Sequence, residues 1–376
     1  MNNIPNSSIL FIFIKISILL YNVLTLLEGV FVMSSLMQQE IFSEPKMLLN
    51  TIKNCEAVIP EIVKVVKEKN LTNFATMARG TSDNAATVFS YVFPLKTGKV
   101  VGSFFPSTYT VYNSKLDLNG TLLVIVSQSG MSKDTIKVMH DAMRDGAIVV
   151  GVTNNANSPV AKEAHFHLFL DVEEEKSVAA TKTYIAELFA LEMLAEGLGG
   201  GIKTDYRQVA KDIEKVLALS DTSINAVAKG IVNDNNYLIL SRGTTLGSAD
   251  ELCLKLTECC YLFAKTFSSA TFMHGPLSLL ADGANLVLFS PKSEFTQEYI
   301  DMAKRAKEKN ATLIAFSDIK EVLSCADYKV EMPSVDAITS PILYGVAASL
   351  LALNIGMEKG YNVDAPRNLN KVTVTL

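Results

Sequence analysis

The stretch TLLVIVSQSGMSKDT, residues 121–135, joins an apolar run to a hydroxyl-rich loop. Its first six residues are predicted to form a strand buried on both faces, because they show no apolar–polar alternation. A helix is predicted after the loop, since Ile136, Met139 and Met143 fall at helical spacing. A strand, a loop and a helix in this order form the unit from which parallel α/β sheets are built.

The same series of apolar runs and loops occurs twice in the chain. The first series comprises NFATMARGTS (73–82), TLLVIVSQSG (121–130), GAIVVGVTNN (146–155) and HLFLDV (167–172). The second comprises NNYLILSRGTT (235–245), NLVLFSPKS (285–293) and ATLIAFSD (311–318). An offset of 163 residues separates Gly80 from Gly243 and also Ser127 from Ser290. The repeat predicts two copies of one doubly wound α/β unit, each a parallel sheet with helices on both faces.

The loop after residue 126 is predicted to bind a small anion. It follows a strand and precedes a helix N-terminus, where backbone N–H groups and the helix dipole favour negative charge. Ser127, Ser129 and Ser132 add hydroxyls, Gln128 adds an amide, and Ser82 ends the first strand at the same sheet edge. The glycine patterns of nucleotide-binding loops are missing, so a sugar monophosphate fits better. The alternative is simple helix capping by Ser129 or Ser132.

The second copy has a different loop at the equivalent position. SQSGMS becomes SPKSEF, and Pro291 removes a backbone N–H donor. We therefore expect one anion-binding loop in a duplicated fold.

Composition excludes several classes of protein. The 376 residues are 49% hydrophobic and 19% charged, which is typical of a globular chain rather than a disordered one. A net charge of −5 without a long basic cluster argues against nucleic acid as a partner. Five cysteines fit neither a disulfide framework nor a zinc site, and free, mostly buried thiols indicate a reducing, cytoplasmic location. The cysteines are Cys55, Cys253, Cys259, Cys260 and Cys325.

The N-terminus does not fit that picture at first sight. Residues 9–27 are almost all apolar and long enough to cross a bilayer, but neither a basic n-region nor a cleavage site accompanies them. We expect the working protein to begin at Met33 or Met37, with residues 1–36 outside the fold. A membrane anchor is the alternative.

Several motifs together resemble the sugar isomerase (SIS) domain family. They are RGTS (79–82), SQSG (127–130), VAATKT (178–183), LKLTE (254–258), MHGP (273–276) and PRNLNKVTVT (366–375). Over residues 37–376 the chain is most similar to the isomerase half of glucosamine-6-phosphate synthase and to SIS-type glucosamine-6-phosphate deaminases. The resemblance implies two tandem flavodoxin-like SIS domains, at 37–206 and 207–366, and a tail at 367–376 that reaches the active site.

The resemblance also implies roles for particular residues. Glu258 matches the base that moves a proton between C1 and C2, His274 the ring-opening residue donated by a neighbouring subunit, and Lys371 the lysine at the open-chain carbonyl. The implied phosphate ligands are Ser82, Ser127, Gln128, Ser129 and Ser132, and the implied sugar-site residues are Glu175, Val178, Ala180, Glu251 and Lys255. The synthase usually has Thr at position 132 and Ser at position 180, so sugar contacts at Ala180 are in doubt.

From their spacing alone, Glu251, Lys255 and Glu258 share one helix face. A charged helix face is more often exposed to solvent than functional, and this is the alternative interpretation. A histidine in a Gly-Pro turn is often a loop residue without a role, and this is the alternative interpretation of His274.

The expected activity is deamination of an amino-sugar phosphate. The synthase takes ammonia from a glutaminase domain, and no such domain is recognisable in this sequence. We therefore expect the opposite sense of reaction, from glucosamine 6-phosphate to fructose 6-phosphate and ammonia, without metal or cofactor. Alternatives are an isomerase or aminotransferase for another amino-sugar or fructosamine phosphate, and a non-catalytic sugar-phosphate sensor. A role for His274 across an interface implies at least a homodimer.

Overall fold

The computed structural model describes residues 34–371. The apolar stretch 9–27 and Met33 lie outside the described residues, as does the end of the tail after Lys371. Met37 lies in the first turn of α2, the first described helix.

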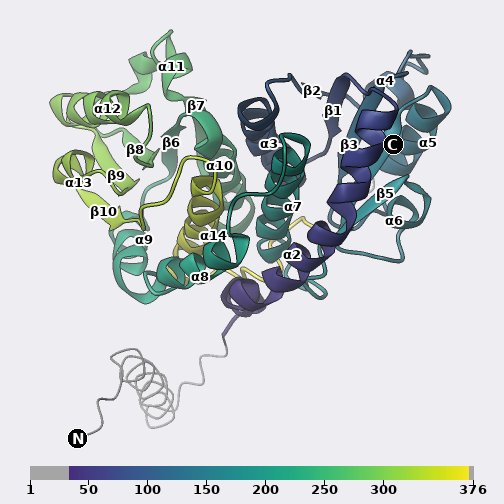
Figure 1. Cartoon of the computed structure of the whole chain (residues 1–376). Helices are drawn as coiled ribbons and strands as arrows, with labels where there is room; N and C mark the ends of the chain where they lie inside the picture. The colour runs from purple at the N-terminus through teal and green to yellow at the C-terminus, as the bar shows by residue number, and fades with distance from the viewer. Residues whose placement is uncertain (1–33, 372–376) are drawn as a thin grey trace, which may run out of the picture. The chain divides into compact units, whose positions relative to one another are not determined.

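Two series of strands and helices make up the described chain (Figure 1). The first contains α2 (Leu36–Glu68), β1 (Asn73–Met77), α3 (Thr81–Thr97), β2 (Gly102–Ser103), α4 (Ser107–Thr110), β3 (Thr121–Val126), α5 (Lys133–Arg144), β4 (Ile148–Thr153), α6 (Pro159–Glu163), β5 (Phe166–Phe169) and α7 (Lys182–Leu198). The second begins with α8 (Tyr206–Leu217), η1 (Ser220–Ile224), α9 (Asn225–Ile231), β6 (Asn236–Ser241), η2 (Gly243–Thr245), α10 (Leu246–Cys260) and β7 (Phe263–Ser268). It ends with α11 (Ser269–Phe272), η3 (Pro276–Leu279), β8 (Asn285–Ser290), α12 (Thr296–Glu308), β9 (Thr312–Ser317), α13 (Lys320–Cys325), β10 (Tyr328–Glu331) and α14 (Ser340–Glu358).

Each series forms a five-stranded parallel sheet, and the two sheets have the same topology. The first has the order β2-β1-β3-β4-β5 and the second β7-β6-β8-β9-β10 when read from the equivalent edge. All strand pairings within them are parallel. This confirms the prediction of two copies of one doubly wound unit. The expected boundary after residue 206 falls at the first residue of α8.

Three strands were missed by the sequence patterns: β2, β7 and β10. Each lies at the edge of its sheet. An edge strand is buried less completely, so β7 (FAKTFS) and β10 (YKVE) carry lysines and half-exposed positions. The central strand β3, by contrast, is buried at all six positions, which produces the continuous apolar run that sequence analysis detects.

Helices α3, α7, α10 and α14 pack against one another between the two sheets. Helices α7 and α14 are buried along almost their whole length. Helix α14 is long and apolar enough to span a membrane, but 89% of its apolar window is buried inside the protein. It is therefore a core helix that joins the two domains.

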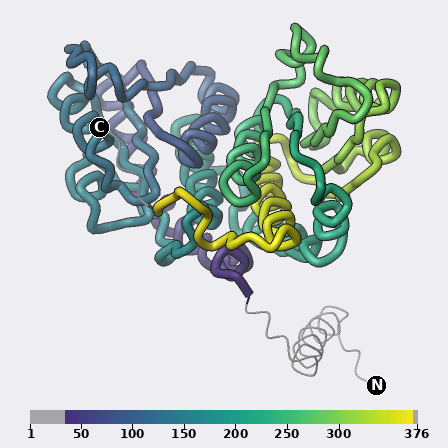
Figure 2. The backbone as a smooth tube through the Cα atoms, turned by 180° about the vertical axis from the view of Figure 1, so that it is seen from behind, coloured from purple at the N-terminus to yellow at the C-terminus, as the bar shows by residue number. Residues whose placement is uncertain are grey.

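The chain crosses between the domains a last time after α14. Figure 2 shows the yellow C-terminal segment running from the second domain to the first. There the backbone carbonyl of Asp364 accepts a hydrogen bond from the N–H of Val178, at 3.0 Å. The Asp364 carboxylate accepts from the backbone N–H groups of Leu36 and Met37 at the start of α2, both at 2.9 Å. The tail is thus fixed to the first domain before it reaches Lys371.

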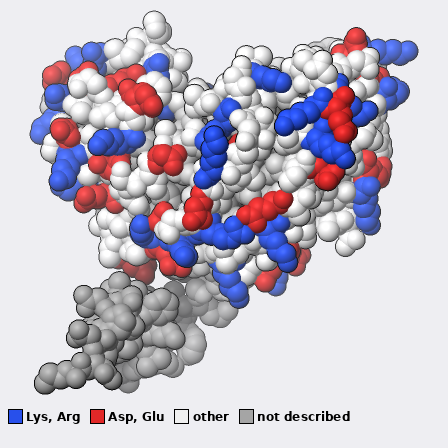
Figure 3. All heavy atoms as spheres, in the orientation of Figure 1, with Lys and Arg blue, Asp and Glu red and all other residues white. Residues whose placement is uncertain are grey.

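The described surface and the cysteines fit the sequence analysis. On the face shown in Figure 3, basic and acidic side chains are interspersed over both domains. Cys55, Cys259 and Cys260 are buried, and Cys253 and Cys325 are half-buried; all five are free thiols.

We expect Gly247→Ala to push α3 and α10 apart. A Cβ atom at Gly247 would lie 2.4 Å from the carbonyl oxygen of Asn84 and 2.6 Å from a methyl carbon of Val88, both on α3. Overpacking of this kind costs about 1–3 kcal/mol, which chemical denaturation would measure. The control is Gly102→Ala on edge strand β2, where a Cβ would meet no atom within 4 Å. Equal unfolding free energies for the two variants would contradict the close contact.

Candidate active site

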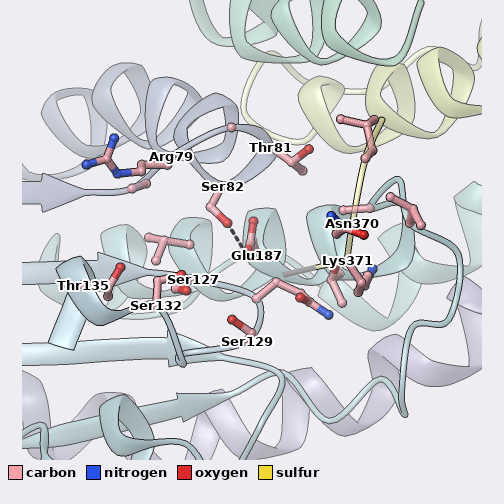
Figure 4. A pocket seen from close by; sticks show the side chains of 18 of the residues that line it. Arg79, Thr81, Ser82, Ser127, Ser129, Ser132, Thr135, Glu187, Asn370 and Lys371 are labelled. Carbon is pink, nitrogen blue, oxygen red and sulfur yellow. Dashed lines mark hydrogen bonds between the residues drawn. The ribbon is translucent and has the colours of Figure 1, made fainter. Parts of the chain in front are cut away.

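A cavity of about 370 Å³ opens at the carboxyl edge of the first sheet (Figure 4). Both domains and the tail contribute to its wall. The lining residues are Ala78, Arg79, Gly80, Thr81, Ser82, Val126, Ser127, Gln128, Ser129, Ser132, Thr135, Val178, Ala180, Thr183, Glu187, Glu258, Leu369, Asn370 and Lys371. Parallel α/β sheets bind their ligands at this edge, so the cavity is the candidate active site.

The hydroxyl-rich loop between β3 and α5 forms one side of the cavity. Gly130 has a φ of +60°, and a Cβ there would lie 2.4 Å from the hydroxyl oxygen of Ser158, so the tight turn requires glycine. The hydroxyl of Ser127 accepts from the N–H of Gly130 at 3.2 Å, and that of Ser129 accepts from the N–H of Met131 at 3.3 Å. Because these hydroxyls act as acceptors within the loop, their hydrogens remain available as donors to a ligand.

Ser132 occupies the N-cap position of α5, but its side chain makes no capping hydrogen bond. The alternative explanation of this serine as a helix cap is therefore not supported by the geometry. Its side chain instead lines the cavity together with those of Ser127 and Ser129. Arg79 adds a positive charge to the same wall, and its guanidinium lies 2.8 Å from the carboxylate of Asp134.

The opposite wall comes from α10 of the second domain. Glu258 lines the cavity with a side chain that is 23% exposed, and its carboxylate lies 2.7 Å from the ammonium of Lys255. Lys255 and Glu251 are fully buried and form a second ion pair at 3.0 Å. The three side chains share one helix face as predicted, but that face is packed rather than solvated. Burial alone would lower the pKa of Lys255; the carboxylates of Glu251 and Glu258 outweigh this and raise it, so Lys255 stays charged.

The start of α3 completes this buried cluster. The carboxylate of Glu251 accepts from the hydroxyl of Thr81 at 3.2 Å and from the side-chain amide of Asn84 at 2.7 Å. The ammonium of Lys255 also donates to the Thr81 hydroxyl, at 3.1 Å. Glu251 and Lys255 thus lie behind the cavity wall, because their polar atoms are used up in holding α10 against α3. They do not line the cavity, in contrast to the sugar contact implied by the resemblance.

The tail and the loop before α7 form the third side. Lys371 donates to a carboxylate oxygen of Glu175 at 2.7 Å and to the carbonyl of Ser177 at 2.9 Å. Glu175 is buried and also accepts from the backbone N–H groups of Thr181 and Thr183. Val178 and Ala180 line the cavity, whereas Glu175 supports the loop and Lys371 from behind.

His274 is the predicted site residue that lies elsewhere. It is exposed in the turn between α11 and η3 and does not line the cavity of its own chain. The three other histidines also lie away from the cavity. His140 pairs with Glu163 at 2.6 Å on the surface, and His165 and His167 make hydrogen bonds beside β4.

The second domain has a pocket at the equivalent sheet edge, and its loop differs as predicted. The N–H of Lys292 already donates to the Asp318 carboxylate at 2.6 Å, and the hydroxyl of Ser290 is buried against the carbonyl of Phe316. These two donors of the loop are therefore occupied, and Asp318 places a negative charge next to it.

Six polar or charged cavity residues were missed as candidates: Arg79, Thr81, Thr135, Thr183, Glu187 and Asn370. The first two lie in the quoted RGTS motif and could have been found there. Glu187 gave no signal, because it belongs to an apolar helix without a visible polar face. Within residues 34–371, three or more His, Cys, Asp or Glu side chains never gather in a way that could hold a metal ion.

Fold and site together define a tandem α/β protein that presents hydroxyl and amide groups at the carboxyl edge of one sheet. A family model for the SIS domain matches residues 70–197 and 230–355. The chain therefore belongs to the SIS domain family.

Comparisons with individual proteins agree with this family. Glutamine–fructose-6-phosphate aminotransferase (isomerizing) of Thermococcus kodakarensis is 32% identical over 349 residues, which cover 90% of this chain and 58% of that protein. The C-terminal domain of glucosamine-fructose-6-phosphate aminotransferase from Francisella tularensis superposes with a TM-score of 0.79 at 22% identity, covering 89% of this chain and 99% of that one. Glucosamine-6-phosphate deaminase of Thermotoga maritima gives a TM-score of 0.74 at 19% identity, with coverages of 91% and 100%.

The roles of Ser132 can be separated by two serine substitutions. We expect Ser132→Ala to weaken sugar-phosphate binding about tenfold, the contribution of one hydrogen bond to a charged group, with little change in stability. Ser158→Ala should do the opposite, because the Ser158 hydroxyl caps α6 by accepting from the N–H of Ala161 at 3.1 Å. Calorimetric titration with fructose 6-phosphate and thermal unfolding would measure both effects. A loss of stability in Ser132→Ala with unchanged affinity would restore the capping explanation.

Proposed function

We propose that the chain is an amino-sugar phosphate isomerase that converts glucosamine 6-phosphate and water into fructose 6-phosphate and ammonia. One observation carries this proposal: the hydroxyl-rich loop of the first domain and Glu258 of the second line the same cavity. Membership of the SIS family supports a sugar phosphate as the ligand. The names of the relatives support fructose 6-phosphate and glucosamine 6-phosphate as the reacting pair. Since the chain spans 58% of that curated relative, the full activity of such a protein is not transferred to it.

In this proposal the phosphate binds to the loop of the first domain. Ser127, Ser129 and Ser132 supply hydroxyl hydrogens, and the N-terminus of α5 supplies the favourable end of a helix dipole. Gln128 and Ser82 line the same side. A phosphate held here leaves the far end of an open-chain sugar directed toward α10 and the tail, because the cavity extends between them (Figure 4).

Glu258 then acts as the general base. Its carboxylate takes the proton from C2 of the open-chain aldose, the electron pair of the C–H bond forms the C1=C2 bond of an enolamine, and O1 takes up a proton from water. Return of the C2 proton to C1 and loss of one N–H proton to water give a 2-imino ketose, which water hydrolyses to the ketone and ammonia. Lys255 keeps the carboxylate in place through its contact of 2.7 Å, while Lys371 is positioned to contact the sugar oxygen that carries charge during the transfer.

His274 is assigned to the cavity of a second subunit in this proposal. It is exposed and remote from its own cavity, which fits a residue that opens the sugar ring in a partner. The protein would then act as a two-fold symmetric dimer or a higher assembly.

We expect the protein to release ammonia and fructose 6-phosphate in equal amounts from glucosamine 6-phosphate. Glu258→Gln should lower turnover about 10²–10⁴-fold, which is the usual contribution of a general base, while binding of fructose 6-phosphate persists. Coupled assays for ammonia and for fructose 6-phosphate measure the activity. Glu308→Gln, an exposed change on α12, is the control. If the folded wild type releases no ammonia, the proposed reaction is refuted; if both variants are equally active, Glu258 is not the base.

The assignment of His274 can be checked by mixing inactive subunits. Glu258→Gln and His274→Ala are each expected to be inactive or nearly so. Randomly mixed dimers should regain about a quarter of wild-type activity, because half of them are heterodimers with one intact composite site. Activity of the co-refolded mixture is compared with that of the two separate variants. No recovery in verified heterodimers would mean that His274 does not act across the interface.

A further inference from the structure

A buried carboxyl group in the cavity has no role in the mechanism above. Glu187 lies on α7, lines the cavity and is 1% exposed. One of its oxygens, Oε1, is 2.8 Å from the hydroxyl oxygen of Ser82, and Figure 4 shows the two side chains pointing toward each other. The other oxygen, Oε2, is buried without a hydrogen-bond partner among the described residues. A buried carboxylate that lacks partners is costly, whereas a neutral carboxylic acid is much less so.

The surroundings of Glu187 favour the neutral form. The pKa of Glu187 is raised to about 8, mainly by burial. The nearby carboxylates Glu175 and Glu251 contribute to this rise, and the hydrogen bond with Ser82 and the charge of Lys371 oppose it only in part. A bound phosphate dianion would add another negative charge and favour the protonated form more strongly.

The titratable and charged groups that face Glu187 come from several elements. The loop before α7 contributes Glu175, α10 contributes Glu251, and the tail contributes Lys371. Tyr184 lies on α7 itself, where burial first of all raises its pKa well above the usual value, so it stays neutral. Arg79 and Glu258 complete the charged groups of the cavity wall.

The state of Glu187 decides what Ser82 can offer to a ligand. A serine hydroxyl has a single hydrogen. If Glu187 is ionised, Ser82 must donate that hydrogen to Glu187 and presents only lone pairs to a phosphate. If Glu187 is protonated, it donates to the oxygen of Ser82, and the hydrogen of Ser82 is free for the phosphate. The distance of 2.8 Å allows both directions.

We propose that Glu187 is a positioning residue for substrate binding: as a neutral carboxylic acid it donates to Ser82 and so directs the Ser82 hydroxyl hydrogen at the phosphate. This inference rests on the phosphate site in the proposed function, not on the reaction that follows binding. It adds a proton requirement to ligand binding. Affinity for a sugar phosphate must fall at alkaline pH, as Glu187 ionises and turns Ser82 from a donor into an acceptor.

The test is calorimetric titration with fructose 6-phosphate between pH 7 and 9.5. This ligand has no amine, and its phosphate, with a second pKa of about 6, is already a dianion over the whole range. The affinity of the wild type should fall about tenfold toward pH 9.5, because a hydrogen bond to a charged phosphate contributes about a factor of ten to affinity. Glu187→Gln should bind nearly as well as wild type at pH 7 and keep that affinity to pH 9.5, because its amide N–H donates to Ser82 at every pH. Ser82→Ala should bind weakly and show a much smaller alkaline decrease, because only the charge repulsion between ionised Glu187 and the phosphate remains.

The matched control is Glu192→Gln, on the same helix. Glu192 is equally buried, and burial raises its pKa well above the usual value, but it does not line the cavity. The Glu192 carboxyl therefore stays protonated in the folded wild type at pH values where it is ionised in the unfolded chain. The free energy of unfolding of the wild type consequently declines as the pH rises above the ordinary pKa of glutamate. This substitution should improve alkaline stability and leave the binding profile of wild type unchanged.

Three results would overturn the proposal: an alkaline decrease in Glu187→Gln equal to that of wild type, a decrease in Ser82→Ala as large as that of wild type, or a loss of affinity for fructose 6-phosphate at pH 7 in a folded Glu187→Gln. If Glu187→Gln lost affinity for glucosamine 6-phosphate but kept its affinity for fructose 6-phosphate at pH 7, Glu187 would instead bind the substrate amine as a carboxylate. Binding with the expected profile but without ammonia release would refute the proposed reaction and leave the role of Glu187 intact. Absence of fructose 6-phosphate binding at all pH values would refute both.

Discussion

The arrangement of the site depends on one buried ammonium group, that of Lys255. It contacts Glu251 at 3.0 Å, Glu258 at 2.7 Å and the Thr81 hydroxyl at 3.1 Å. The Glu251 and Glu258 contacts lie within α10 of the second domain. The contact with Thr81, together with the hydrogen bonds of Glu251 to Thr81 and Asn84, joins α10 to the first turn of α3 in the first domain. Desolvating a lysine is expensive and is compensated only when its partners are close and correctly placed. A small shift between the domains would break the hydrogen bonds of this cluster with Thr81 and Asn84, so the cluster helps to fix the relative position of α10 and α3 at the cavity.

That constraint explains why the fold is duplicated although one copy alone has the hydroxyl-rich loop. The first domain supplies phosphate donors at its sheet edge, and the second supplies Glu258 from a helix rather than from its own sheet edge. The second loop does not line this cavity: Pro291 lacks a backbone N–H, and that of Lys292 donates to Asp318, without any effect on the first site. The tail adds a third connection, because Lys371 reaches Glu175 of the first domain after leaving α14 of the second.

The sequence was informative where burial and repetition leave a clear pattern. Central strands such as β3 and β8 are buried almost throughout and were predicted, whereas edge strands β7 and β10 were missed because their exposed positions accept lysine. The serine loop was found for a similar reason, since Ser127, Ser129 and Ser132 fall within six residues directly after an apolar run. Pattern alone could not decide whether Glu251 and Lys255 are solvated or buried, because that depends on the packing of α10 against α3 from another repeat.

Glu187 shows most clearly what a sequence cannot specify. A glutamate in a helix usually marks the face toward water, yet α7 is buried on all sides between α2, α3 and α14, and Glu187, Glu192 and Glu196 are all buried. Glu196 is held by Lys96 at 2.6 Å, whereas Glu192 has no partner for either carboxyl oxygen among residues 34–371. Glu187 differs from both because it faces a cavity and a serine. The same residue type on one helix therefore serves as an ion-pair partner, as a buried neutral acid and, in our proposal, as the group that orients the Ser82 hydroxyl toward a ligand, and the surrounding elements decide which.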